Sequence, residues 1–204
     1  MIRNVVFDVG NVLVRWSPPE VICRSFGLAV GSDKNMMRAQ ALFRSPIWRR
    51  LNLGELSLPE AELAYQAELG LTPDQTNKFF FHVMDHQGLI EGTVAIAQRL
   101  KHAGHHVFGL TDNVHEIVAY HKSRHHFWQL FDGCIVSAEI GRLKPDPAIF
   151  RHLLETFTLK AGETVFFDDV QPNVDGAKSV GIEARLFTTP GQCEEDLRAL
   201  GLRF

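Results

Sequence analysis

The chain has 204 residues, of which 45% are hydrophobic, so it can bury a sizeable core in one domain or in a domain with an insertion. Its formal net charge of −3 and its scattered basic residues argue against a nucleic-acid partner. No apolar run approaches the roughly 18 residues of a membrane-spanning helix, and the N-terminus lacks a signal-peptide layout, so we expect a cytoplasmic protein without a membrane partner.

The first element is an apolar run over residues 2–7, which predicts a buried strand of a parallel sheet. Asp8 follows this run directly and opens the sequence Asp8-Val-Gly-Asn-Val-Leu. Ligands of open α/β sheets bind outside the carboxyl ends of the strands. The carboxylate of Asp8 therefore stands where an active site is expected.

Residues 17–88 show helical patterns without convincing strands. Three helix-start signals recur there, each with a hydroxyl residue followed three positions later by an acid or amide: Ser17 with Glu20, Ser57 with Glu60, and Thr72 with Gln75. Each pair predicts a capping box. This segment is therefore expected to be a helical insertion.

From about residue 89 onward, helices alternate with strands. The predicted elements are a helix over residues 92–103, a strand over 106–110, a helix over 147–156 capped by Asp146, a strand over 164–167, a helix over 173–180 and a strand over 184–187. Such alternation predicts an α/β fold with a doubly wound parallel sheet and right-handed crossovers.

Polar residues follow these apolar runs. Thr111, Asp112 and Asn113 end the second run, and the acid pair Asp168-Asp169 ends the third. Between them, Lys144 lies in the stretch Gly141-Arg-Leu-Lys-Pro-Asp-Pro-Ala-Ile-Phe. The chain therefore presents a carboxylate, a hydroxyl, a lysine and an acid pair, in that order.

This set resembles the four motifs of the haloacid dehalogenase superfamily, which consists mostly of aspartate-based, magnesium-dependent phosphatases. The resemblance implies a Rossmann-like catalytic core over residues 1–16 and 89–204. It also implies that residues 17–88 form a helical cap, which closes over the site and selects the substrate. The Asp-x-Gly-Asn opening is similar to that of a branch that includes sugar-phosphate phosphatases.

The same resemblance implies a role for each motif residue. Asp8 is the expected nucleophile, Lys144 stabilises the charge on the nucleophile and the phosphoryl group, and Thr111 donates its hydroxyl to a phosphoryl oxygen. Asp112 and Asn113 are expected to join Thr111 and Lys144 in substrate binding.

Magnesium is the implied cofactor, because a carboxylate attacks a phosphate dianion only when positive charge offsets their repulsion. Its expected protein ligands are Asp8, the backbone carbonyl of Gly10 and Asp169. Asp168 is expected to act through a metal-bound water, although which acid of the pair binds directly is left open.

Two positions depart from the family pattern. Many of its phosphatases carry a second aspartate, the general acid and base, where this chain has Gly10. Asp112 stands where an uncharged residue is more usual, and we expect it to point away from the site or to pair with an arginine. The first departure leaves the rate and the range of leaving groups open.

Three functions remain in competition. The favoured one is hydrolysis of a small phosphorylated metabolite. A 2-haloacid dehalogenase, which works without metal, typically lacks the acid pair Asp168-Asp169, and a catalytically reduced binding or regulatory protein is suggested by Gly10 and Asp112. The sequence leaves the oligomeric state and the substrate open, with four candidate selectors in the cap: Arg44, Trp48, Arg49 and Glu55.

Histidine and cysteine residues suggest no further metal site. The pairs His82 with His86 and His121 with His125 have a helical spacing of four, but neither has the glutamate of the zinc-protease motif. We expect packing or solvated histidines. The cysteines are odd in number and lack a metal-ligand spacing, which suits structural thiols in a reducing compartment: Cys23, Cys134 and Cys193.

Overall fold

The computed structural model describes residues 1–85 and 88–204, and these form one five-stranded sheet and its flanking helices. All neighbouring strands are parallel, in the order β3-β2-β1-β4-β5. The strands are β1 (Asn4–Phe7), β2 (His106–Thr111), β3 (Gly133–Val136), β4 (Thr164–Asp168) and β5 (Glu183–Leu186). The predicted doubly wound parallel sheet is confirmed.

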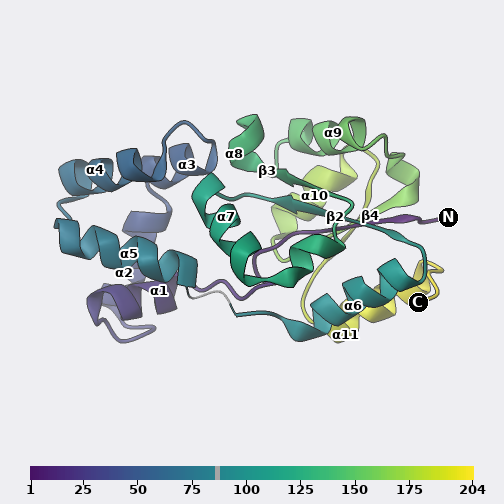
Figure 1. Ribbon diagram of the computed structural model, residues 1–204, viewed down its shortest axis with the longest axis horizontal. Helices are drawn as coiled ribbons and strands as arrows, with labels where there is room; N and C mark the ends of the chain where they lie inside the picture. Colours follow the sequence, from purple (N-terminus) through teal and green to yellow (C-terminus); the bar gives the residue numbers. More distant parts are fainter. Residues whose placement is uncertain (86–87) are drawn as a thin grey trace.

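Helices cover both faces of the sheet. Figure 1 shows α9 (Pro147–Thr156) and α10 (Gln171–Lys178) on one face, and α6 (Glu91–His102) and α11 (Pro190–Ala199) on the other. Side chains alternate along the central strand accordingly. Val5 and Phe7 pack with the α6 and α11 side, whereas Val6 packs with the α9 and α10 side. The central strand is therefore buried from both faces.

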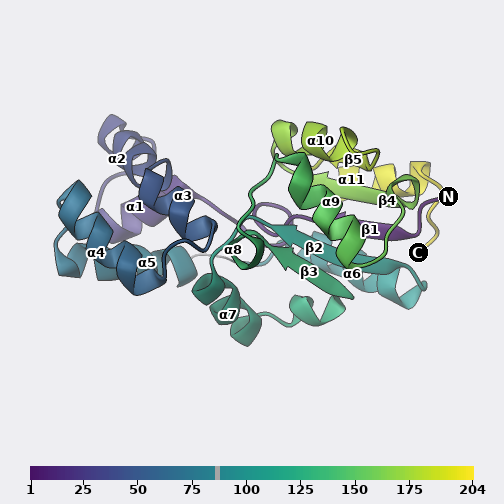
Figure 2. The same ribbon diagram turned by 90° about the horizontal axis from the view of Figure 1, so that it is seen from above.

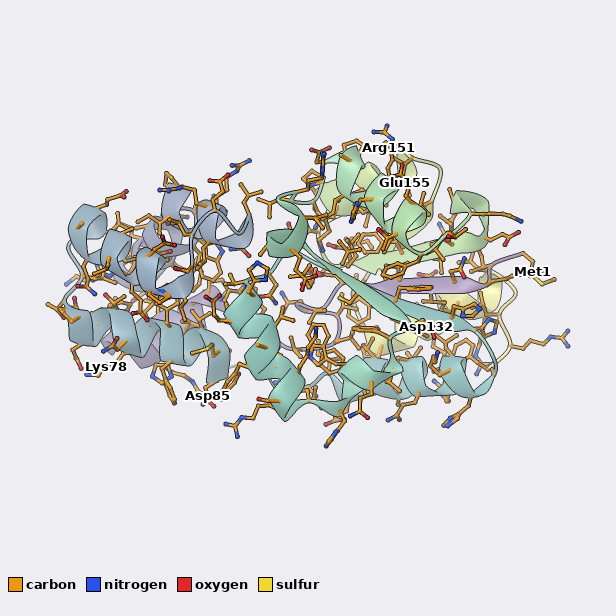
Figure 3. The ribbon with its side chains drawn as sticks, turned by 45° about the horizontal axis from the view of Figure 1, so that its top comes forward. Met1, Lys78, Asp85, Asp132, Arg151 and Glu155 are labelled. Atoms are coloured by element: carbon orange, nitrogen blue, oxygen red, sulfur yellow. The ribbon has the colours of Figure 1, made fainter. Side chains whose placement is uncertain are left out.

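Helix α9 shows why this sequence folds as it does locally. The carboxylate of Asp146 accepts a hydrogen bond from the backbone N–H of Ala148 at 2.8 Å, and Pro147 occupies the first helical position. Ile149 and Phe150 face the core, while Arg151 and Glu155 project outward (Figure 3). Capping and amphipathicity thus fix this helix where the sequence predicts it.

The described part of the segment between the first strand and α6 contains five helices, which we call the helical insertion. They are α1 (Pro18–Phe26), α2 (Asp33–Phe43), α3 (Pro46–Asn52), α4 (Leu58–Leu69) and α5 (Pro73–Asp85). They enclose a hydrophobic cluster around Tyr65, Phe79 and Phe80, to which the later chain adds Val114 and Ile117. Figure 2 shows that the insertion lies beyond the carboxyl ends of the strands.

All three predicted helix starts are found. The box at Thr72 is reciprocal, with bonds of 3.0 Å and 3.2 Å to Gln75, and the backbone N–H of Ser57 donates to Glu60 at 2.8 Å. Two further helices start at Ser32 and Ser45, which lack an acidic residue or glutamine three positions later. Their hydroxyls nevertheless accept from backbone N–H groups, so the missing sequence signal is only the second half of the box.

Other core elements had no sequence signal that we recognised. They are β3, α7 (His115–Arg124), α8 (Ser137–Ile140), α11 and the short helices η1 (His126–Leu130) and η2 (Ala161–Glu163). Strand β3 has only four residues, and its Gly133 lies against the ring of Phe157, where an added Cβ would come within 2.2 Å of Cε1. Glycine is required there for packing, but it obscures the strand pattern. None of the described helices is long and apolar enough to cross a membrane.

Candidate active site

The predicted site residues converge on a cavity of about 470 Å³ between the strand ends and the helical insertion. Phe7 of β1 is level with Gly109 of β2 and Phe167 of β4, so the residues after these positions meet at one edge of the sheet. The cavity is lined there by Asp8, Gly10, Thr111, Asp112, Asn113, Lys144 and Asp169.

Lys144 is the buried cation at the centre of this group. Its Nζ lies 2.9 Å from Oδ1 of Asp8 and 2.7 Å from Oδ2 of Asp168, and it also donates to the carbonyl of Leu110 at 3.3 Å. Burial lowers the pKa of this ammonium, but the neighbouring carboxylates outweigh burial and hold the pKa above its ordinary value. Lys144 is therefore a permanent positive charge between two acids.

Asp8 occupies an environment that disfavours its charged form. Burial raises its pKa to about 7, against the lowering effect of Lys144 and with a further rise from Asp168. Oxygens of Asp8, Asp168 and Asp169 lie within 4.8 Å of one another, and this is the group of potential metal ligands found in the described part of the chain. Three acids with one ammonium leave excess negative charge, which suits a divalent cation with oxygen ligands.

The two acids at the end of β4 differ in their partners. Asp168 is fully buried, and besides Lys144 it accepts from the backbone of Val170 at 2.8 Å and from the Asn173 amide at 3.0 Å and 3.1 Å. Asp169 lines the cavity and accepts from the amide of Asn11 at 3.0 Å. Burial raises the pKa of Asp169, against the lowering effect of that amide. This geometry favours Asp169 over Asp168 as a direct metal ligand.

Asp112 does not form the arginine pair that the sequence suggested. Its Oδ1 accepts from the backbone N–H of Lys144 at 3.0 Å, and no arginine in the described part of the chain lies within ion-pair distance. Burial raises the pKa of Asp112, and the charge of Lys144 partly opposes this. One physical effect is clear: the side chain fixes the backbone of the lysine loop.

Asn113 is tied to the helical insertion through Ser137. The backbone N–H of Asn113 donates to Oγ of Ser137 at 2.9 Å, and this hydroxyl donates to the carbonyl of Asn52 in α3 at 2.7 Å. Ser137 was not singled out from the sequence, because a serine after an edge strand carries no distinctive pattern. Asn173, whose amide donates to Asp168, likewise has no distinctive sequence pattern.

Asn11 was also missed as a site residue, although a signal was present. Its backbone has φ of 53°, in the left-handed region that asparagine tolerates better than most residues. In this conformation its amide reaches Asp169, and its Oδ1 accepts from the backbone N–H of Trp16 at 2.9 Å. Glycine and asparagine are both typical turn residues, and asparagine tolerates the left-handed region, so the Gly10-Asn11 dipeptide is the sequence signal for this turn.

The opposite wall of the cavity comes largely from the insertion and is aromatic. The rings of Trp16 and Trp48 stack at 6.2 Å with an angle of 8°, and Phe43 packs edge-on against both. Of the candidate selectors, Trp48, Arg44 and Arg49 line the cavity. Glu55 is not among the lining residues; it lies 3.6 Å from Arg50.

The structure describes three of the four paired histidines and all three cysteines. His121 is fully buried, and its ring lies 5.8 Å from that of His125, which is half-buried, so these two histidines pack against each other. His86 lies outside the described residues, which leaves its pair with His82 a prediction. All three cysteines are free thiols, as expected.

The sequence is similar to those of known hydrolases. A model of haloacid dehalogenase-like hydrolases matches residues 2–181. A sesquiterpene phosphatase of Aspergillus oryzae is 25% identical over 184 residues, which cover 88% of this chain and 87% of that protein. A D-ribitol-5-phosphate phosphatase of Bacteroides thetaiotaomicron is 24% identical over 195 residues, which cover 90% of each protein.

The fold is similar to that of a solved structure. A solved haloacid dehalogenase family enzyme of Bacteroides thetaiotaomicron, in complex with magnesium and inorganic phosphate, superposes with a TM-score of 0.77 and 18% identity over 93% of this chain and 96% of that one. At this identity the likeness concerns the fold. The family model, in contrast, spans most of the sequence, and we conclude that the chain belongs to the haloacid dehalogenase-like hydrolases.

Proposed function

We propose that this hydrolase is a Mg²⁺-dependent phosphatase that cleaves a small phosphate monoester through an aspartyl-phosphate intermediate on Asp8. The observation that carries the proposal is the buried Lys144, held between Asp8 and Asp168 at the floor of the cavity. The two full-length relatives, named as phosphatases of a sesquiterpene and of D-ribitol 5-phosphate, support the reaction class.

The residues of the site fit a magnesium ion. Asp8, Asp169 and the carbonyl of Gly10 offer hard oxygen ligands, and Asp168 can contribute through a water because its own oxygens are already hydrogen-bonded. When bound, Mg²⁺ supplies positive charge that offsets repulsion between the substrate dianion and the acids.

The chain's own groups account for the covalent step. The carboxylate of Asp8 forms a bond to phosphorus while the bond from phosphorus to the ester oxygen breaks, and water then hydrolyses the acyl phosphate to release inorganic phosphate. Lys144 stabilises the charge on Asp8 and on the transferring group, and Thr111 donates its hydroxyl to a phosphoryl oxygen. Asp112 contributes by fixing the loop that carries Lys144.

The proton for the leaving oxygen needs another source, because Gly10 offers no acid. Water, the substrate itself or a residue of the helical insertion remains available. A Cβ at Gly10 would meet the nearest atom, Cβ of Trp16, at 3.9 Å, an ordinary van der Waals distance. The missing acid is therefore not a consequence of crowding at this Cβ position.

The test is turnover of 4-nitrophenyl phosphate with and without Mg²⁺, alongside halide release from a 2-haloacid. Phosphate release that depends on Mg²⁺ supports the proposal, and halide release without metal supports the dehalogenase. If neither phosphate nor halide is released, a binding or regulatory protein is favoured. Cytoplasmic location and the lack of a nucleic-acid or membrane partner stay predictions.

A further inference from the structure

The cavity carries more positive charge on its insertion side than a phosphoryl group at the strand ends requires. Arg44 follows α2 directly, Arg49 lies in α3, and both are exposed and line the cavity. Within the described chain, no carboxylate lies within ion-pair distance of either guanidinium. Their neighbour Arg50, in contrast, pairs with Glu55.

An apolar surface lies in the same cavity wall as these two arginines. The stacked rings of Trp16 and Trp48 are held edge-on by Phe43, whose centroid lies 5.3 Å from Trp16 and 5.0 Å from Trp48. Phe43 in turn contacts the buried ring of Phe79 at 5.1 Å, which anchors the wall in the insertion core. Rings packed in this way lose little freedom when a flat, apolar group binds against them.

The two ends of the cavity therefore differ in chemistry. At the strand ends, Lys144 and the acid cluster suit a phosphoryl group together with a divalent cation. At the insertion end, two guanidinium groups suit a second anion, since guanidinium matches carboxylate and phosphate oxygens. A volume of about 470 Å³ leaves room for a leaving group that spans both ends.

Resting on the proposed function, we propose that the substrate is a phosphate monoester whose leaving group carries a second anion, a carboxylate or a further phosphate. Arg44 and Arg49 bind this anion, while Trp16 and Trp48 contact the apolar body between the two charges. The substrate class is thus a dianionic ester with an additional negative group, rather than a neutral polyol or a terpenoid phosphate.

Binding of phosphonates tests this without relying on turnover, because their carbon-phosphorus bond resists hydrolysis. The probes are benzylphosphonates that carry a carboxylate, a phosphonomethyl or a neutral carbamoyl group at the meta or para position, measured by titration calorimetry with Mg²⁺ at low ionic strength. We expect wild type to bind at least one anionic probe about fivefold more tightly than the carbamoyl probe substituted at the same ring position. The better of the two anions identifies the second group.

The double variant Arg44→Met, Arg49→Met keeps the apolar stems and removes both charges. It should abolish the preference for the anionic probes and leave the affinity for the carbamoyl probe within about twofold of wild type. The matched control is Arg50→Met, which lies on the same helix as Arg49 but outside the cavity lining. It should keep the full preference for the anionic probes. Circular dichroism checks that each variant is folded.

Two results overturn the inference. Equal affinity of wild type for charged and neutral probes means that no second anion is recognised. Equal weakening of all probes in the double variant means that the arginines hold the phosphoryl group itself. Mg²⁺-dependent hydrolysis of 4-carbamoylphenyl phosphate is measured in parallel, so that failure of the phosphatase proposal is distinguished from failure of the second-anion site.

Discussion

The side-chain amide of Asn11 donates to Oδ2 of Asp169 at 3.0 Å, across 158 residues of sequence. The oxygen of the same amide accepts from the backbone of Trp16, which leads into the helical insertion. One left-handed residue therefore connects the proposed metal ligand to the start of the insertion. This connection makes Asn11 a positioning residue whose loss should be measurable.

We expect Asn11→Gly to weaken Mg²⁺ binding by about tenfold or more, because hydrogen bonds to a metal ligand typically have effects of this size. Glycine accepts the φ of 53°, so the backbone conformation is retained while the amide is lost. Titration calorimetry of Mg²⁺ gives the affinity. The control is Thr158→Gly, at the other non-glycine residue with positive φ in the described chain, and unchanged Mg²⁺ affinity in Asn11→Gly would contradict the role.

Asp8→Asn should abolish turnover and leave the fold intact. The amide preserves the shape of the side chain but cannot act as the nucleophile. Steady-state kinetics with an aryl phosphate and circular dichroism measure the two properties. If the folded variant kept more than a few per cent of wild-type activity, Asp8 would not be the nucleophile.

Mg²⁺ should raise the melting temperature of wild type, because it binds the clustered acids of the native state. Asp169→Ala should remove most of that rise. Thermal denaturation with and without Mg²⁺ measures the shift, and Asp175→Ala, an exposed acid on the nearby helix α10, serves as the control. An identical shift in wild type and Asp169→Ala would exclude Asp169 as a direct ligand.

Gly10→Asp should lessen the dependence of phosphoryl transfer on the leaving group. Wild type lacks the acid at this position, so its single-turnover rates should fall steeply as the pKa of the leaving alcohol rises. The introduced carboxyl should help poor leaving groups while it is protonated, and this benefit should fade as pH rises through its titration. Equal slopes for both proteins, measured with matched aryl and alkyl phosphates, would mean that another residue already serves as the acid.

His121 should make the protein less stable in mild acid. Burial lowers its pKa from 6.5 to about 4, with a further lowering from His125. Between these two values the unfolded chain binds more protons than the native protein, so stability is full above pH 6.5 and declines toward pH 4. For this histidine alone, we expect a loss of about 2 kcal/mol between pH 7.5 and pH 5.

Urea denaturation at those two pH values measures the loss. The variant His121→Leu keeps an apolar group in the interior and should lose this part of the pH dependence, whatever its stability at neutral pH. The exposed His102→Gln is the control and should behave as wild type. Parallel pH profiles for wild type and His121→Leu would show that this histidine does not titrate as expected.

The sequence predicts most of the fold because its signals are local. Strand β1, helix α9 and the starts of α1, α4 and α5 each follow from periodicity or from a capping pattern within a few residues. Strand β3 could not be recognised, because it begins with Gly133, a residue that is depleted in strands and that is needed here for packing against Phe157. Predicted ends differ from the observed ones by one or two residues in α10 and β5, where helix and strand termini carry weak signals.

The candidate site also contains residues that the sequence predicts and residues that it does not. Asp8, Lys144 and Asp169 belong to motifs whose order along the chain, and whose positions relative to the predicted strands, can be recognised from the amino-acid sequence. Asn11 and Ser137 act through hydrogen bonds to residues distant in sequence, and no local pattern encodes a partner at that range. The stacking of Trp16 on Trp48 likewise depends on how the insertion lies over the strand ends.

The central position of β1 has a consequence for how the chain folds. This strand precedes both of its neighbours in the chain, which begin only at His106 and Thr164. The helical insertion between β1 and β2 supplies nearly all residues of one hydrophobic cluster, and only Val114 and Ile117 come from the later chain, so most of it can condense while the sheet is still incomplete. A nascent chain therefore holds an apolar strand unpaired behind an already formed helical unit until β2 and β4 emerge, which is the stage at which aggregation threatens most.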